Sequence, residues 1–211
     1  MATLSAGCGG LSYTVNRSLL KDISIENKLI LFDAENDASI AIDERENIRK
    51  QMSETRQDIA DSKAKIKEAK SDAERATLKG DKNAETIGDL AEKVYDKKID
   101  FLRERISFLR ARLDAQDRLV YVAWARYELA KAKLVKKNNV RGANAIDLAD
   151  YEEQVDKYVE TAKEDVESVK KDEADLAVAQ QEWLVEREKL LAASGGGLGS
   201  SWVEDSSGWG Y

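Results

Sequence analysis

Residues 95–134 read YDKKIDFLRERISFLRARLDAQDRLVYVAWARYELAKAKL and carry a largely apolar series with alternating steps of four and three residues. The positions of this series are Tyr95, Ile99, Leu102, Ile106, Leu109, Leu113, Gln116, Val120, Ala123, Tyr127, Ala130 and Leu134. A spacing of 3.5 residues that persists over more than three heptads is typical of coiled-coil helices. The stretch therefore predicts one long helix with an apolar face, which we call its seam.

The same spacing continues on both sides of this stretch, over residues 34–76 and 155–190. Two breaks separate the three series. The first is at Gly80, a residue suited to the position that follows a helix, and the second covers residues 137–144. The polar residues Arg45, Glu173 and Arg187 occupy seam positions, where such residues usually set the register of the helices. The sequence therefore predicts three consecutive helices.

Short connections at the two breaks force neighbouring helices to run antiparallel. The predicted fold is all-α: an elongated antiparallel three-helix coiled-coil bundle whose middle helix is the most buried. Residues 1–17 and 195–211 are rich in small and polar residues, which predicts a flexible tether and a flexible tail. The predicted rod between them, residues 18–194, contains helices at about 20–79, 84–137 and 145–194.

The composition excludes several classes of function. The chain has 211 residues with 34 Lys and Arg against 41 Asp and Glu, and its net charge of −7 disfavours nucleic-acid binding. It has no His and one Cys, which removes imidazole chemistry and a thiolate zinc site. No phosphate-binding glycine loop or nucleophile motif is present. We therefore expect no enzymatic activity, cofactor, metal or small-molecule substrate.

The longest apolar run, residues 119–125, falls short of the roughly 20 residues that span a bilayer.

The string Ser5-Ala6-Gly7-Cys8 stands near the beginning of the sequence. It resembles the lipobox of bacterial lipoproteins, with Ala6 and Gly7 at the two small positions, Cys8 at the lipid-modified position, and Ser5 where Leu is usual. The resemblance implies a lipid anchor on Cys8 and, because Gly9 rather than Asp follows, a location on the periplasmic face of the outer membrane. It also predicts that the reading frame continues upstream with a basic and apolar leader. The alternative is an unmodified cysteine in a cytoplasmic protein.

A cationic cluster flanks the second break. An up-down-up bundle places this turn and the N-terminus at the same end, so we expect the cluster to face a membrane surface or a partner. Each cation near anionic lipid contributes about 1 kcal/mol. The alternative is that these cations are solvated and complement the helix dipole. The cluster consists of Lys131, Lys133, Lys136, Lys137 and Arg141.

The C-terminal segment contains Trp202, Trp209 and Tyr211 among glycines and serines. Aromatic side chains in a flexible segment bury nothing within the chain itself. One interpretation is a peptide that docks on a partner. The other is a disordered tail without a binding role.

Residues 125–154, with Gly142 between two helical stretches, resemble the helix-turn-helix of outer-membrane efflux factors of the TolC type. The resemblance implies a long helix, a glycine turn and a second long helix in this order. It adds no catalytic or ligand-binding residue.

Together these features predict a non-enzymatic, lipid-anchored periplasmic coiled-coil spacer or adaptor that links the outer membrane to a partner. The alternative is a soluble coiled-coil subunit of a larger assembly, in which partner helices complete the Ala-rich seam of the first helix. The expected partners are another protein or further copies of this chain, and a membrane contacted through the lipid anchor.

Overall fold

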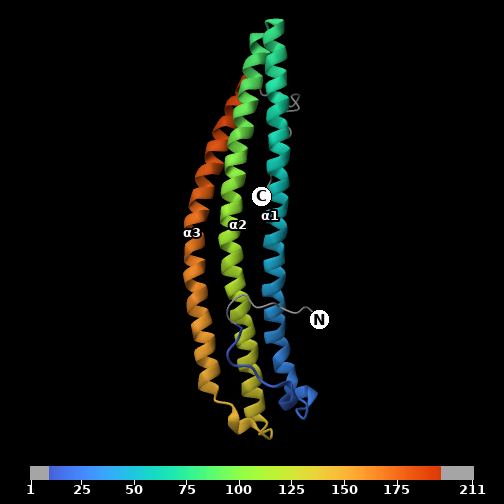
Figure 1. Cartoon of the computed structure of the whole chain (residues 1–211), viewed down its shortest axis with the longest axis vertical. Helices are drawn as coiled ribbons and strands as arrows, with labels where there is room; N and C mark the ends of the chain where they lie inside the picture. Colours follow the sequence, from blue (N-terminus) through green and yellow to red (C-terminus); the bar gives the residue numbers. More distant parts are fainter. Residues whose placement is uncertain (1–9, 196–211) are drawn as a thin grey trace. The chain divides into compact units, whose positions relative to one another are not determined.

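The computed structural model describes residues 10–195, which form three long helices and two short 3-10 helices (Figure 1). No strand occurs in this part of the chain. The all-α three-helix bundle predicted from the sequence is confirmed. The elements are η1 (Arg17–Leu20), α1 (Ile25–Lys79), α2 (Lys82–Lys137), η2 (Ala143–Ala145) and α3 (Leu148–Ala193).

The chain forms two compact units, each built from parts of all three long helices. Of the described residues, unit 1 comprises 10–49 and 111–169, and unit 2 comprises 50–110 and 170–195. Among the described residues, α2 contributes more buried side chains than α1 or α3, as expected for a helix that packs against two neighbours.

The predicted break at Gly80 is the connection between α1 and α2. Gly80 has a positive φ of 70°, and its N–H donates to the carbonyl of Thr77 at 3.0 Å. The next N–H, of Asp81, donates to the carbonyl of Ala76 at 3.0 Å, so the last carbonyls of α1 are satisfied. The Asp81 carboxylate then accepts from the N–H of Ala84 at 3.0 Å and caps α2.

The second predicted break is the connection between α2 and α3, and it is more elaborate than a simple turn. Asn139 and Gly142 have positive φ values of 48° and 97°. The 3-10 helix η2 follows, so α3 begins at Leu148 rather than near residue 145. The side chain of Asp147 accepts from the N–H of Ala149 at 3.0 Å. This local capping fixes the start of α3.

The first helix also begins later than the sequence predicted, at Ile25 instead of about residue 20. Residues 17–20 form η1, whose first turn is capped by Asn16: its side-chain oxygen accepts from the N–H of Ser18 at 2.9 Å. Ser24 then accepts from the N–H of Asn27 at 3.4 Å at the start of α1.

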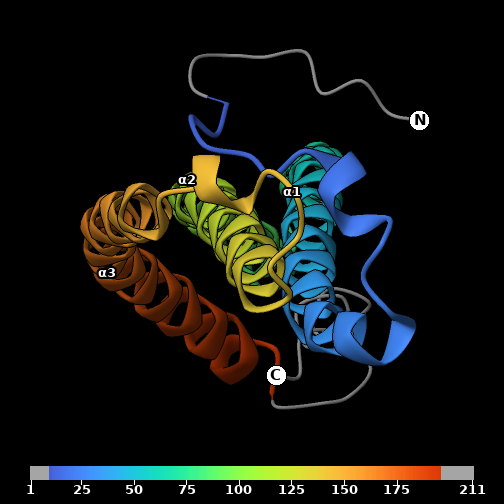
Figure 2. The ribbon, with the colours of Figure 1, turned by 90° about the horizontal axis from the view of Figure 1, so that it is seen from below.

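The core of unit 1 joins all three helices, the N-terminal segment and the connection between α2 and α3. Figure 2 shows the α2 segment of this unit between those of α1 and α3. The buried members are Val15, Ile23, Leu31, Ala132, Leu134, Val135, Ala143, Ile146 and Tyr151.

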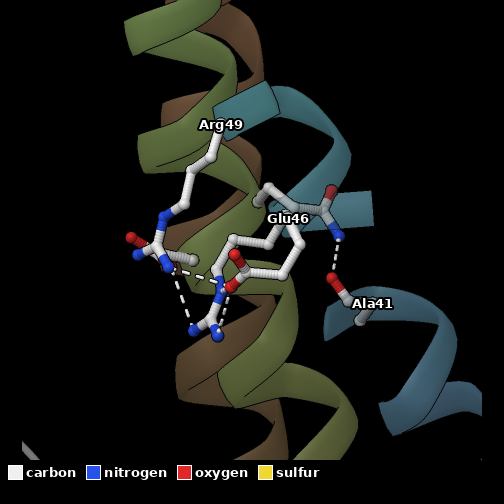
Figure 3. A network of polar contacts seen from close by, with 6 residues as sticks. Ala41, Glu46 and Arg49 are labelled. Carbon is white, nitrogen blue, oxygen red and sulfur yellow. Dashed lines mark hydrogen bonds and ion pairs between the residues drawn. The ribbon is translucent and has the colours of Figure 1, made fainter. Parts of the chain in front are cut away.

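Polar residues link α1 and α2 at the seam of unit 1 (Figure 3). The amide of Gln116 donates to the carbonyl of Ala41 at 2.9 Å. Arg45, which the sequence placed at a seam position, bonds to Glu46 and lies 3.7 Å from the Asp117 carboxylate. Glu46 also accepts from Arg49 at 2.9 Å. A shift in register between α1 and α2 would separate Gln116 from Ala41 and Arg45 from Asp117.

The core of unit 2 is smaller and contains a close approach between α1 and α2. Its buried members are Ala69, Ala91, Val94, Trp183 and Leu190. The rings of Phe101 and Trp183 stack with their centroids 5.4 Å apart. Ala69, Ala73 and Ala76 of the Ala-rich seam are buried here within the same chain.

Gly88 is required by this close approach. A Cβ at position 88 would lie 2.8 Å from the Cβ of Ala73 and 3.1 Å from its backbone. We expect Gly88→Ala to lower the free energy of unfolding by about 1 kcal/mol, because overpacking costs about 1–3 kcal/mol and the gain in helix propensity offsets up to about 1 kcal/mol. Urea denaturation followed by circular dichroism measures this change. Thr86→Ala, at an exposed position of the same turn, is the control and should not destabilise. A stabilising Gly88→Ala would contradict the close packing.

Candidate binding surface

The N-terminal segment is bound to α2 and α3 of unit 1. The amide group of Gln154 pairs with both backbone groups of Tyr13: it accepts from the N–H at 2.8 Å and donates to the carbonyl at 3.0 Å. The N–H of Val15 donates to the Glu128 carboxylate at 2.7 Å, and the Val15 side chain is buried. We call residues 10–16 the strap. Residues 13–15 therefore lie against the bundle, where the sequence predicted a tether.

A buried ion pair lies under the strap. Glu128 and Lys131 are both buried and bonded to each other one turn apart on α2. The Lys131 ammonium also lies 4.6 Å from the centre of the Tyr127 ring. Burial and nearby carboxylates, Glu128 among them, raise the pKa of Tyr127 and of Tyr151 above their usual values. The pair therefore serves as an internal polar contact that also holds the strap.

The predicted cationic cluster is only partly a surface feature. Lys131 does not belong to it, because its side chain is buried and paired. Lys133 is exposed and lies 3.0 Å from the Glu152 carboxylate. Lys136 is half-buried, while Lys137 and Arg141 are exposed. The surface cations near the connection between α2 and α3 are thus Lys133, Lys137 and Arg141.

The remaining predicted site residues lie outside residues 10–195. These are the lipidation site Cys8 and the aromatic residues Trp202, Trp209 and Tyr211. Their proposed roles remain predictions.

A second apolar stripe runs along the solvent side of α1 in unit 1. Ile25 is 74% exposed, Leu29 55%, Phe32 57% and Ile40 51%. At 3.6 residues per turn, these positions share one side of the helix. The buried residues Leu31 and Ala38 lie on roughly the opposite side. We call Ile25, Leu29, Phe32, Asn36 and Ile40 the outer stripe.

Acidic residues border the outer stripe. Residues 21–44 contain seven carboxylates and two lysines, a net charge of −5, and all seven carboxylates are exposed. Glu26, Asp33, Asp37 and Glu44 follow one border, because their spacings of seven, four and seven residues keep them on one side of the helix. The stripe is therefore an apolar surface inside a negative field.

Unit 2 has a shallow, open groove of about 440 Å³ between α2 and α3. The ion pair of Lys97 and Glu182, with 2.7 Å between Nζ and Oε2, lines this groove. Hydrogen bonding to Glu182 raises the pKa of Lys97, so this amine stays protonated and is a poor general base. Val178 and Val185 add exposed apolar surface. The groove is open to solvent along its length.

No family model, curated protein or solved structure matches this chain. Within the described residues, no helix combines the length and the apolar character needed to cross a membrane. Nor does this part of the chain gather three or more His, Cys, Asp or Glu side chains that could hold a metal ion. The outer stripe, the strap and the groove are therefore the candidate functional features of the described residues.

The sequence analysis missed the outer stripe, although the signal is present. Ile25, Leu29, Phe32 and Asn36 follow steps of four, three and four residues. This series begins before the buried seam at residues 34–76 and has a different phase. The signal is therefore a second four-three series on the same helix.

Proposed function

We propose that this protein is a non-enzymatic helical adaptor, anchored by a lipid on Cys8, that binds a partner protein. The observation that carries the proposal is the outer stripe of α1, because large apolar side chains left exposed in a row mark an interaction site more often than chance. The long helices provide extended polar surfaces, and the groove beside Lys97 is shallow. These features favour a binding role over catalysis.

The anchor is supported by the lipobox-like string and by the position of the strap. Cys8 precedes Gly10, the first residue of the strap, by two positions. A lipid on Cys8 would therefore attach unit 1 to a bilayer through a short connection. Lys137 and Arg141 belong to the same unit and are exposed, and each would add about 1 kcal/mol near anionic lipid. The proposed location is the periplasmic face of the outer membrane, where the protein acts as a spacer or adaptor.

The second candidate is a soluble subunit of a larger helical assembly, without a lipid. The outer stripe favours it equally, since its four-three spacing resembles the seam of a coiled coil. In this case the partner helix covers the outer stripe, and the buried Ala-rich seam has no part in assembly. Both candidates use the outer stripe to bind a partner, and they differ in whether Cys8 carries a lipid.

Mass spectrometry of the protein expressed from its own gene, with the upstream reading frame, separates them. We expect cleavage before Cys8 and a diacylglycerol-modified cysteine, and we expect the protein in the membrane fraction. Cys8→Ser should move it to the soluble fraction. Ser5→Ala, which keeps the cysteine and a small residue beside it, is the control and should leave the protein in the membrane fraction. An unmodified Cys8 with an intact N-terminus would reject the anchor and favour the soluble subunit.

A further inference from the structure

We propose that the outer stripe of α1 binds a cationic amphipathic helix of a partner protein. The inference deepens the adaptor proposal and rests on it, since it names the chemistry of the partner. It does not depend on the lipid anchor.

The spacing of the stripe favours a helix as the bound element. Ile25, Leu29 and Phe32 stand at i, i+4 and i+7, which is the spacing through which one helix anchors another. Asn36 continues the series by a further four residues and lies exposed between Phe32 and Ile40. A single polar residue in such a seam specifies the register of the partner helix at some cost in affinity.

The charge around the stripe favours a cationic partner. The carboxylates Glu26, Asp33, Asp37 and Glu44 run beside the apolar residues for the whole length of the stripe. Lysines or arginines that flank the apolar face of a partner helix would lie opposite this border. Complementary charges of this kind steer association and fix orientation.

The same charge distribution disfavours the other occupants. A second copy of residues 21–44 would bring its seven carboxylates against seven more, and like charges across an interface are unfavourable. An anionic membrane would repel the acidic border for the same reason. A cationic amphipathic helix can cover the apolar stripe with its apolar face and pair its positive charges with the acidic border.

A synthetic peptide tests the inference on the purified full-length protein. The probe is a fluorescein-labelled amphipathic peptide of about 18 residues made of leucine and lysine, and the control is the same peptide with glutamate in place of each lysine. We expect the lysine peptide to bind, with an affinity that falls as salt is added, and the glutamate peptide not to bind. Fluorescence anisotropy measures both.

Two variants locate the binding site. Leu29→Ser with Phe32→Ser should weaken binding at least about tenfold, because apolar anchors carry most of the energy of such interfaces. Asp33→Lys with Asp37→Lys should weaken binding of the lysine peptide and allow the glutamate peptide to bind. The matched control, Leu78→Ser with Val166→Ser, removes two exposed apolar side chains outside the stripe and outside the groove and should change affinity less than about twofold. Circular dichroism verifies that each variant remains helical.

Several outcomes would overturn the inference. Equal binding by the wild type and the Leu29/Phe32 variant would show that the peptide responds to net charge alone. A wild-type dimer in sedimentation that the same variant dissociates would assign the stripe to a second copy of the chain. Stripe-dependent binding to phosphatidylcholine vesicles without peptide binding would assign it to lipid.

The inference and the lipid anchor can fail separately. An unmodified Cys8 together with stripe-dependent peptide binding would reject the anchor and support the binding site on α1.

Discussion

Replacement of Lys131 by methionine should lower the free energy of unfolding by about 3–5 kcal/mol, the usual cost of removing one partner of a buried ion pair. Methionine is about as long as the aliphatic part of lysine, but it leaves the Glu128 carboxylate buried and uncompensated. The carboxylate also holds the N–H of Val15, so the strap should loosen with it. Urea denaturation gives the free energy, and hydrogen exchange of residues 13–15 reports the strap.

Lys133→Met is the matched control. Lys133 lies two positions away on α2 and forms an exposed ion pair with Glu152. Exposed pairs contribute about 0–1 kcal/mol, so this variant should differ little from wild type. If Lys131→Met lowered the free energy of unfolding as little as Lys133→Met, the Glu128–Lys131 pair would be solvated in solution, contrary to its burial in the structure.

Trp183→Ala should destabilise unit 2 by about 3–5 kcal/mol, the usual cost of truncating a buried tryptophan to alanine. The Trp183 side chain is buried, stacks on Phe101 and packs in the cluster that contains Leu190. Its removal leaves a cavity that the surrounding small alanines cannot fill. Urea denaturation measures the loss, and hydrogen exchange should rise in residues 87–101 and 183–190.

Trp183→Phe separates the loss of volume from the loss of an aromatic ring. The Nε1–H of Trp183 is buried and has no hydrogen-bond acceptor among the residues that the structure describes. Phenylalanine therefore keeps a ring against Phe101 and removes an unsatisfied donor, and we expect it to cost within about 1 kcal/mol. An equal loss for the alanine and phenylalanine variants would argue against the packing described here.

The three long helices were predictable because their pattern is local. The four-three spacing repeats over residues 34–76, 95–134 and 155–190, and glycine with polar residues marks each break. The middle helix has apolar residues off its seam, such as Val94 and Val122, and both are buried in the structure. Helical periodicity therefore predicted both the fold class and the most buried helix.

The helix starts and the strap were not predictable from such a pattern. The start of α1 depends on Asn16 and Ser24, and the start of α3 on η2 and Asp147. The strap depends on hydrogen bonds to side chains more than a hundred residues away in the sequence. Contacts of that separation leave no trace in a periodic pattern.

Lys131 shows why the sequence alone misplaced one member of the cationic cluster on the surface. In the sequence Lys131 is one of five cations near the turn, and its charge does not reveal that it is buried while Lys137 is exposed. In the structure, Glu128 one turn earlier and the ring of Tyr127 give it a buried partner and a buried surface. The outer stripe differs from Lys131, because its signal is local: two apolar series of different phase overlap on one helix, and the longer one marks the buried seam.

The strap also determines how tension applied at the N-terminus would travel through the protein. Its backbone is bonded to Gln154 of α3 and Glu128 of α2, while α1 is the next long helix along the chain. A pull on the first residues therefore loads α3 and α2 of unit 1 before any force reaches α1. The strap thus shields α1, the helix that carries the outer stripe, from force applied at the N-terminus.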